Sequence, residues 1–280
     1  TSYMVGGPAD IFALPETIDE LAATVQFCAD HGIPYFFIGT GANVLVADRG
    51  FRGVVLTVSR SLTSMVRRGV FVDVEAGVLL QNLIMFCEKN GLQGVEYLSG
   101  IPGTAGGALI MNAGVDKHEI GAVVESVSIL DSNGTVATVP QDAISFSYRA
   151  APELQGKTII GCRLKLALSD SEQLKETRLA QIRKRCAAQP LDLPSCGSVF
   201  KRPPGYYVGK LVEDLGLKGY RYGNAMISDK HGGFILNRGG ATAHDILYLI
   251  KMVRRKVHER YAITLEPEVR LAGLDLPGPE

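Results

Sequence analysis

Hydrophobic positions along the chain form short runs rich in β-branched residues, interrupted by stretches with helical spacing. Each short run predicts a strand, and the predicted strands cover residues 3–14 (broken at 6–8), 33–38, 54–58, 70–74 and 158–168. The runs 126–130 and 135–139 flank the turn sequence of residues 131–134 and predict a hairpin. The chain therefore begins with a strand-rich region.

Helical spacing and capping signals predict four helices. Residues 17–20 form a capping box before apolar positions at helical spacing, and residues 169–172 form a second one that opens a helix through about Cys186. A third helix is predicted from about 79 to 89, because residues 90–91 are Asn-Gly, a common end signal. Thr242 begins the clearest helix, whose buried stripe consists of Ile246, Ile250, Val253, Val257 and Tyr261.

The order of these elements favours an α+β fold. Strands outnumber helices through residue 170, and the two mix afterwards. Pro190 and Pro194 bracket a break in the chain, which is a candidate domain boundary.

Composition narrows the classes of function. The 280 residues carry 29 basic and 29 acidic side chains, so no global field favours nucleic acid or an anionic membrane. No apolar run is long enough to span a bilayer, and no signal segment opens the chain. The five cysteines are scattered singly, which argues against a disulfide framework and a zinc site and for a reducing compartment such as the cytoplasm.

Two glycine-rich stretches are the main candidate chemistry. Residues 99–114 contain five glycines and a proline, and residues 38–45 contain Gly39 and Gly41. Residues without a Cβ let backbone N–H groups approach an anion such as a phosphate. Two such loops suggest a diphosphate held between them, although tight turns in an α/β domain remain the alternative. Val44 stands where a dinucleotide fingerprint needs its third glycine, so ordinary Rossmann binding is not expected.

Three polar clusters follow in the second half. Arg149 ends an extended segment, Ser198 follows a glycine in a predicted strand, and residues 265–270 place Glu266, Glu268 and Arg270 on one face of another. Each has an ordinary structural explanation when taken alone: a surface arginine, a hydrogen-bonded serine and a salt-bridged strand.

Together with the glycine loops, these clusters occur in the order of a known family. The chain resembles UDP-N-acetylenolpyruvoylglucosamine reductase, also called UDP-N-acetylmuramate dehydrogenase, a bacterial cell-wall flavoenzyme. The resemblance runs from residues 6–9 to residues 268–270, nearly the whole chain. Its motifs are residues 39–43, 100–107, 112–114, 148–149, 197–201 and 217–219.

The resemblance implies a fold and two domains. Residues 1–168 would form an FAD-binding domain of the vanillyl-alcohol-oxidase (PCMH) type, built from two α+β subdomains. Residues 169–280 would form a smaller α+β substrate-binding domain, with the last strand returning to the FAD-binding half. The short separation of Arg149 and Ser198 resembles the shorter type of the family, without a tyrosine-bearing loop. Ala151 departs from the serine expected two residues after the arginine.

The resemblance also implies a reaction and its residues. NADPH would reduce noncovalently bound FAD, and a hydride would then pass to UDP-N-acetylglucosamine enolpyruvate, giving UDP-N-acetylmuramate for peptidoglycan synthesis, cell shape and cell division. Arg149 matches the family's catalytic arginine, which grips the substrate carboxylate, and Ser198 matches its proton donor. Glu268 matches the family's glutamate, which orients the substrate. No metal is expected.

Further binding residues are expected from the two glycine loops and from the region after residue 185, near the serine motif. FAD would be bound by Gly39, Thr40, Gly41, Ala42, Asn43, Val44, Ser99, Gly100, Pro102, Gly103, Thr104, Gly106, Gly107, Asn112, Ala113 and Gly114. The uridine diphosphate sugar would be bound by Arg202, Tyr207, Lys210 and Asn237. Arg185 and Arg270 are weaker candidates for phosphate contacts with either FAD or the sugar nucleotide. Small molecules are therefore the expected partners, without nucleic acid or membrane insertion, and the oligomeric state stays open.

Two other functions compete. Another FAD-dependent oxidoreductase of this fold, such as a sugar or hydroxy-acid oxidase, often attaches its flavin through a histidine near the first glycine loop. None of the five histidines lies in residues 39–43 or 99–114, which weakens that reading. The alternative of a non-catalytic flavin or nucleotide-sugar binding protein is opposed by the presence of Arg149, Ser198 and Glu268 together.

Overall fold

The computed structural model describes residues 1–116, 118–131 and 134–276, and the chain divides into two compact units. The larger unit comprises Ile11–Thr40 and Gly53–Arg185, and the smaller unit comprises Thr1–Asp10, Gly41–Arg52 and Cys186–Glu280. The sequence-based boundary lies between residues 168 and 169. The observed division instead keeps most of the following helix with the larger unit and adds two N-terminal segments to the smaller one.

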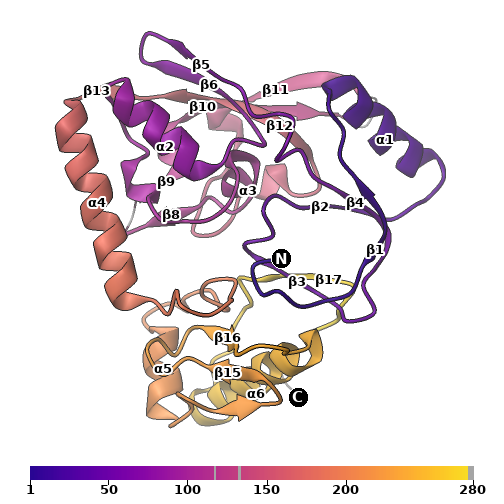
Figure 1. The fold of residues 1–280 in the computed structure, drawn as a ribbon, viewed down its shortest axis with the longest axis vertical. Helices are drawn as coiled ribbons and strands as arrows, with labels where there is room; N and C mark the ends of the chain where they lie inside the picture. Colours follow the sequence, from indigo (N-terminus) through magenta and orange to yellow (C-terminus); the bar gives the residue numbers. More distant parts are fainter. Residues whose placement is uncertain (117, 132–133, 277–280) are drawn as a thin grey trace. The chain divides into compact units, whose positions relative to one another are not determined.

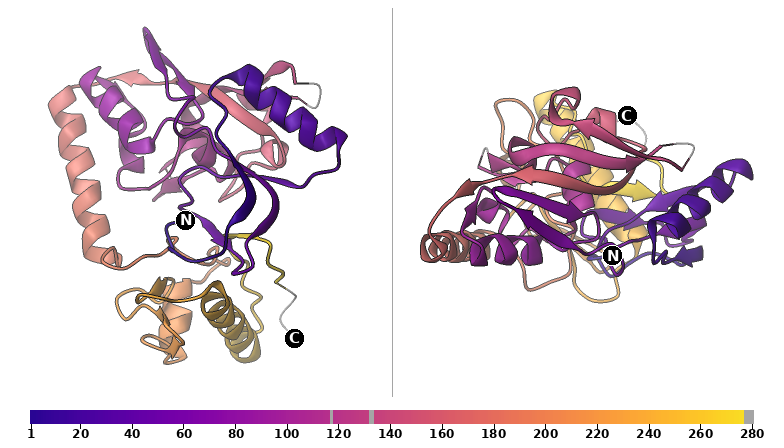
Figure 2. Two further views of the ribbon diagram at one scale, coloured as in Figure 1. Left: turned by 45° about the vertical axis from the view of Figure 1, so that its right-hand side comes forward. Right: turned by 90° about the horizontal axis from the view of Figure 1, so that it is seen from above.

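The larger unit is built on a five-stranded antiparallel sheet, visible in Figure 1 and from above in Figure 2. Its strands, in spatial order, are β11 (Val136–Pro140), β10 (Val124–Leu130), β12 (Thr158–Lys165), β6 (Phe71–Glu75) and β5 (Met65–Arg68). Strands β10 and β11 pair antiparallel, which confirms the predicted hairpin, although residues 132–133 of its turn lie outside the described residues.

Four helices belong wholly or mainly to the larger unit: α1 (Ile18–Asp30), α2 (Leu80–Lys89), α3 (Ala105–Ile110) and α4 (Ser171–Ala188). Thr17 caps α1 as predicted, by accepting a hydrogen bond from the Glu20 N–H. The predicted capping box at 169–172 is wrong in detail, because the side chain of Asp170 accepts from the Gln173 N–H. Helix α4 runs beside α2 (Figure 1), and Arg178 of α4 forms an ion pair with Glu88 of α2 at 2.5 Å.

Short strands complete the larger unit, and β1 (Ala9–Ala13) and β4 (Phe51–Leu56) cross its boundaries along the chain. Strands β1, β4 and β2 (Tyr35–Phe37) form a three-stranded sheet. Strand β7 (Leu92–Gln93) pairs with β13 (Ala167–Leu168), and β8 (Gly114–Val115) pairs with β9 (His118–Glu119). The predicted strand at 158–168 is thus two strands with different partners, since β12 pairs with β6 and β10.

The smaller unit contains a three-stranded antiparallel sheet of β14 (Arg221–Tyr222), β15 (Ala225–Ile227) and β16 (Ile235–Asn237), against which helix α6 (Ala243–Tyr261) packs. Helix α5 (Val208–Asp214) also belongs to it. Strand β17 (Arg270–Ala272) pairs parallel with β3 (Val44–Val46), so the end of the chain returns to the segment after the first glycine loop.

Each unit has its own hydrophobic core. One core joins residues of the sheet and helices of the larger unit, and the other joins α5, α6 and β15 with Tyr3 and Leu45. The α6 prediction is confirmed by the Thr242 capping box and by four of its five stripe residues being buried, with Tyr261 half-buried. The mixed strands and helices confirm the α+β class. Within the described residues, no helix is both long and apolar enough to cross a membrane.

Candidate active site

Ser198 lies in an extended segment of the smaller unit that forms isolated bridges instead of a regular strand. It forms a bridge with Phe234, and Phe200 forms one with Pro267. The preceding Gly197 has a φ of 75°, a conformation that glycine adopts without a Cβ clash. The Ser198 Oγ lies 3.3 Å from the Phe200 carbonyl oxygen, to which it donates. A glycine turn therefore presents the serine on a hydrogen-bonded segment.

Glu268 lies on the neighbouring segment. Its backbone N–H donates to the Val199 carbonyl oxygen at 2.8 Å, and its own carbonyl oxygen accepts from the Asn43 Nδ2 at 2.9 Å. The predicted strand over 265–270 is wrong in extent, because β17 begins only at Arg270. Glu266 is exposed and pairs with Lys201 at 2.7 Å. The structure thus places the predicted Ser198 and Glu268 on adjacent backbone segments, with Glu268 opposite the residue after Ser198.

His231 is a neighbour of Ser198 that is not among the predicted site residues. A Cβ placed on Gly233 would lie 3.1 Å from the His231 Nδ1 and 3.2 Å from the Ser198 Oγ, so both groups border this glycine. The Nδ1 accepts a hydrogen bond from the Gly233 N–H at 3.1 Å. Burial, with a contribution from Lys218, lowers the pKa of His231. The Gly-Gly pair after the histidine was the available sequence signal.

Arg149 belongs to the larger unit and stands at the tip of a tight turn. Ser147 and Ala150 exchange both backbone hydrogen bonds at 3.0 Å, leaving Tyr148 and Arg149 as the two-residue loop. Arg149 has a φ of 55°, a left-handed conformation that costs a non-glycine residue about 1–2 kcal/mol. Its Nη2 donates to the Gly114 carbonyl oxygen at 3.1 Å. Such strain at a polar side chain is typical of functional sites.

The first glycine loop offers backbone donors. Among the described residues, the N–H groups of Thr40, Gly41 and Ala42 donate no hydrogen bond to the protein. Gly39 stands close to the second loop, because a Cβ there would lie 2.7 Å from the Thr104 Oγ1. Consecutive unengaged N–H groups fit the diphosphate of a dinucleotide cofactor.

The second glycine loop is more internally bonded than the sequence suggests. The Ala105 and Gly106 N–H groups donate to the Val78 and Ala76 carbonyl oxygens at 2.8 and 2.9 Å, and Thr104 caps helix α3 through the Gly107 N–H. Gly100 and Gly103 have positive φ values of 80° and 138°.

The remaining predicted FAD contacts have varied surroundings. Ser99 is buried and donates to the Glu96 carbonyl oxygen. Val44 begins the buried strand β3, Pro102 lies between the two positive-φ glycines, and Asn112, Ala113 and Gly114 follow helix α3.

The predicted substrate contacts in the smaller unit differ in exposure. The Arg202 guanidinium lies over the exposed Tyr207 ring, 4.7 Å from its centroid, and Lys210 pairs with Asp214 one helical turn away. Asn237 is buried instead, and its amide bonds the backbone of Tyr3, Gly239 and Ala241. Its side chain therefore organises the loop before α6.

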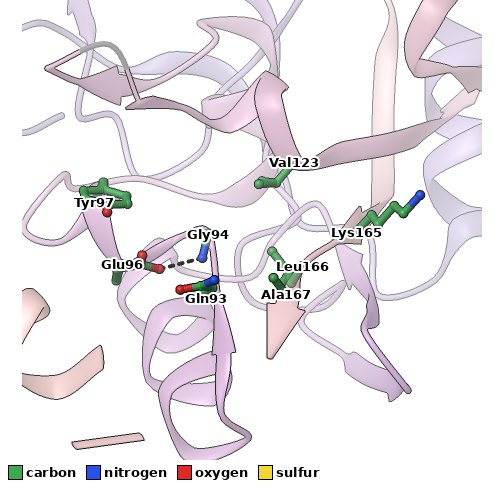
Figure 3. Close-up of a pocket in the computed structure, with 8 residues that line it drawn as sticks. All are labelled: Gln93, Gly94, Glu96, Tyr97, Val123, Lys165, Leu166 and Ala167. Carbon is green, nitrogen blue, oxygen red and sulfur yellow. Dashed lines mark hydrogen bonds between the residues drawn. The ribbon is translucent and has the colours of Figure 1, made fainter. Parts of the chain in front are cut away.

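A separate cavity of about 510 Å³ lies in the larger unit (Figure 3). Its wall contains none of the predicted site residues and is formed by Gln93, Gly94, Glu96, Tyr97, Val123, Lys165, Leu166 and Ala167. The Glu96 carboxylate in this wall accepts from the Gly94 N–H at 2.6 Å, as the dashed line shows. This carboxylate therefore stabilises the adjoining turn.

The five cysteines are all unpaired, and four of them are buried. Burial raises the pKa of Cys87 and Cys162 to about 12 and that of Cys196 to about 11. In the part of the chain that the structure describes, no cluster of three histidine, cysteine or acidic side chains could hold a metal ion.

Comparison with known proteins identifies two matching protein families. Residues 9–140 match an FAD-binding domain, and residues 189–272 match the C-terminal domain of UDP-N-acetylenolpyruvoylglucosamine reductase. The reductase of Caldanaerobacter subterraneus subsp. tengcongensis is 43% identical over 98% of this chain and 90% of its own length, and that of Alkaliphilus oremlandii is 42% identical with the same coverage.

A solved structure extends the agreement to the fold. The crystal structure of the UDP-N-acetylenolpyruvylglucosamine reductase from Thermus caldophilus superposes with a TM-score of 0.81 at 34% identity, covering 97% of this chain and 95% of that one. Sequence relatives and fold therefore agree over nearly the whole chain: it belongs to the family of UDP-N-acetylenolpyruvoylglucosamine reductases, which are FAD-dependent oxidoreductases.

Proposed function

We propose that the chain reduces UDP-N-acetylglucosamine enolpyruvate to UDP-N-acetylmuramate with NADPH, a step of peptidoglycan synthesis in the cytoplasm. The observation that carries this proposal is the hydrogen bond from the Glu268 N–H to the Val199 carbonyl oxygen, which puts Glu268 opposite the residue that follows Ser198. A hydroxyl and a carboxyl group on adjacent segments suit protonation and orientation of a small carboxylic acid substrate.

FAD would be bound noncovalently by the first glycine loop. When bound, FAD supplies a hydride carrier between NADPH and the vinyl carbon of the substrate. The N–H groups of Thr40, Gly41 and Ala42 are the proposed donors to its diphosphate, since none of them is engaged within the described protein. None of the histidines lies in either glycine loop, which supports noncovalent attachment.

Arg149 would bind the substrate carboxylate. A guanidinium presents two parallel N–H donors to a carboxylate, and its charge stabilises negative charge that develops beside that group. The strained turn that holds Arg149 supports this role, because it fixes the backbone from which the side chain extends.

Ser198 would protonate the α-carbon of the substrate. The substrate gains a hydride at the vinyl carbon, so charge balance requires a proton at the adjacent carbon. The Ser198 O–H would release that proton and recover one from solvent. Glu268 would orient the carboxylate or enolate oxygen, and it must be protonated to donate a hydrogen bond there.

Arg202, Tyr207 and Lys210 are the proposed contacts to the uridine diphosphate. The exposed aromatic ring of Tyr207 and two cations near the serine motif suit a base and a diphosphate. Asn237 is left out of this set because its amide is occupied by backbone groups. We also assign the chain to the shorter type of the family, since β12, β13 and α4 fill most of the sequence between Arg149 and Ser198.

An anaerobic assay tests the proposed function. NADPH should bleach the flavin absorbance of the purified holoenzyme, and the enolpyruvyl sugar nucleotide should restore it while UDP-N-acetylmuramate forms. Acid precipitation should then leave the flavin in the supernatant. Reoxidation by oxygen alone, with no turnover of the enolpyruvyl substrate, would instead support the alternative of an oxidase.

A further inference from the structure

Asn112 is a fully buried polar residue in a strained backbone conformation. Its exposed fraction is 0%, and its φ is 40°, in the left-handed region that asparagine tolerates better than most residues. Every polar atom of its side chain has a protein partner. The Nδ2 donates to Glu119 Oε2 at 2.6 Å and to the Ser147 carbonyl oxygen at 2.9 Å, and the Oδ1 accepts from the Gly121 N–H at 3.0 Å.

This set of bonds leaves the side chain no donor for a cofactor. An amide nitrogen has two N–H donors, and both are used by Glu119 and Ser147. The Asn112 Oδ1 also lies close to the backbone of Gly121, since a Cβ on Gly121 would be only 2.8 Å from this oxygen. The buried amide is therefore a structural junction.

What the junction holds is the turn that carries Arg149. Ser147 is the first residue of this tight turn, and it exchanges both backbone hydrogen bonds with Ala150. Two residues after Asn112, the Gly114 carbonyl oxygen accepts from the Arg149 Nη2 at 3.1 Å. One short segment, residues 112–114, thus contacts both the base of the turn and the guanidinium at its tip.

We propose that Asn112 is a positioning residue for Arg149: its amide tethers Ser147 and so fixes the tight turn from which the Arg149 guanidinium reaches the substrate carboxylate. This inference rests on the proposed role of Arg149. A displaced guanidinium would still neutralise charge in its neighbourhood but would lose the aligned pair of donors, and a misplacement of about 1 Å can slow a reaction about 10²-fold.

A double substitution separates the tether from the rest of the junction. Asn112→Asp keeps the shape and the acceptor for Gly121 but loses both donors, and it places a second carboxylate beside Glu119, so the single variant is at risk of misfolding. When Glu119→Gln is added, the amide nitrogen at position 119 can donate to the carboxylate at position 112. The hydrogen bond between the two positions is then restored with donor and acceptor exchanged. The bond that stays missing is the one to Ser147. Glu119→Gln alone is the matched control, because its Oε1 still accepts from Asn112.

Four readouts in the holoenzyme test the proposal. We expect the double variant to keep its FAD content and its rate of reduction by NADPH, while reoxidation by the enolpyruvyl substrate slows about 10²-fold relative to Glu119→Gln. Hydrogen exchange should become faster at the Ser147 and Ala150 amides, a readout that does not depend on activity. Reoxidation at the rate of the control, or loss of FAD from the double variant, would overturn the proposal.

Arg149→Ala, measured in parallel, separates the positioning role of Asn112 from the substrate-binding role of Arg149. If Arg149→Ala slows reoxidation and the double variant does not, the positioning role of Asn112 is wrong while the role of Arg149 stands. If Arg149→Ala reoxidises at the wild-type rate, the proposed role of Arg149 itself is wrong, and the positioning role falls with it.

Discussion

The Glu268 backbone N–H donates a hydrogen bond to the Val199 carbonyl oxygen, 2.8 Å away. This bond joins two segments that are distant in sequence and places a carboxyl-bearing residue next to the residue that follows Ser198. The Asn43 side chain adds a second bond by donating to the Glu268 carbonyl oxygen at 2.9 Å. The backbone of Glu268 is therefore held on both sides, independently of what its side chain does.

Replacing Glu268 with alanine should slow substrate reduction without unfolding the protein. The backbone bonds that hold the residue survive, whereas the carboxyl group that orients the substrate is lost, and loss of a placed acid or base typically costs about 10²-fold or more. The measurement is the rate of reoxidation of the reduced enzyme by the enolpyruvyl substrate.

Glu266→Ala is the matched control for this experiment. Glu266 lies two residues away, is exposed, and pairs with Lys201, and a surface pair of this kind contributes little, so the rate should stay within about twofold of wild type. Equal rates for the two variants would remove Glu268 from the mechanism.

Gly39→Ala should weaken FAD binding by about tenfold, because overpacking a close contact costs about 1–3 kcal/mol. The added Cβ would lie 2.7 Å from the Thr104 Oγ1, so the first loop or the cap of α3 must shift. Titration of the apoenzyme with FAD measures the effect. Gly209→Ala is the control, since its Cβ would meet its nearest neighbour at an ordinary 3.7 Å. An unchanged Kd for Gly39→Ala would contradict the proposed loop.

The stability of the protein should fall as the pH drops below about 6.5, partly because of His231. Burial lowers the pKa of His231 in the folded state below its ordinary 6.5, so the unfolded state binds the proton more readily in this range. Its contribution is fully present above pH 6.5 and is lost as the pH falls toward the folded-state pKa. Protonation would also prevent the Nδ1 from accepting the Gly233 N–H.

Denaturant titrations between pH 5 and 8 measure this dependence. His231→Gln should flatten the pH profile of the free energy of unfolding below about pH 6.5. Parallel profiles for wild type and His231→Gln would show that another group is responsible.

Local sequence signals predicted the elements well where the signal and the contact are both local. Thr17 and Thr242 cap helices as expected, because a side chain three residues from its N–H partner needs no tertiary information. The strand expected over 265–270 depends on distant partners: Phe200 bridges Pro267, and regular pairing with β3 begins only at Arg270. Alternation of side chains cannot reveal where such a partner starts.

The residues of the candidate site could be selected from the sequence, but their surroundings could not. The motif order led to Arg149, Ser198 and Glu268 as candidates, since glycines and charged residues keep recognisable spacings. The surroundings of Ser198 were not predictable, because His231 is distant in sequence and the two side chains both border Gly233 only in the folded chain. The role of Asn112 was also hidden: the motif suggests a cofactor contact, and only burial and three internal hydrogen bonds reveal the tether to Ser147.

Ser198→Ala provides the most direct test of the proposed mechanism, with the two half-reactions measured separately by stopped flow. Reduction of the flavin by NADPH needs no proton at the sugar nucleotide and should keep the wild-type rate. Reoxidation by the enolpyruvyl substrate should slow by about 10²–10⁴-fold, and Ser198→Cys should recover part of that loss, since a thiol can donate from a similar position. A Ser198→Ala enzyme that reoxidises with substrate at the wild-type rate would contradict the assignment of Ser198 as the proton donor.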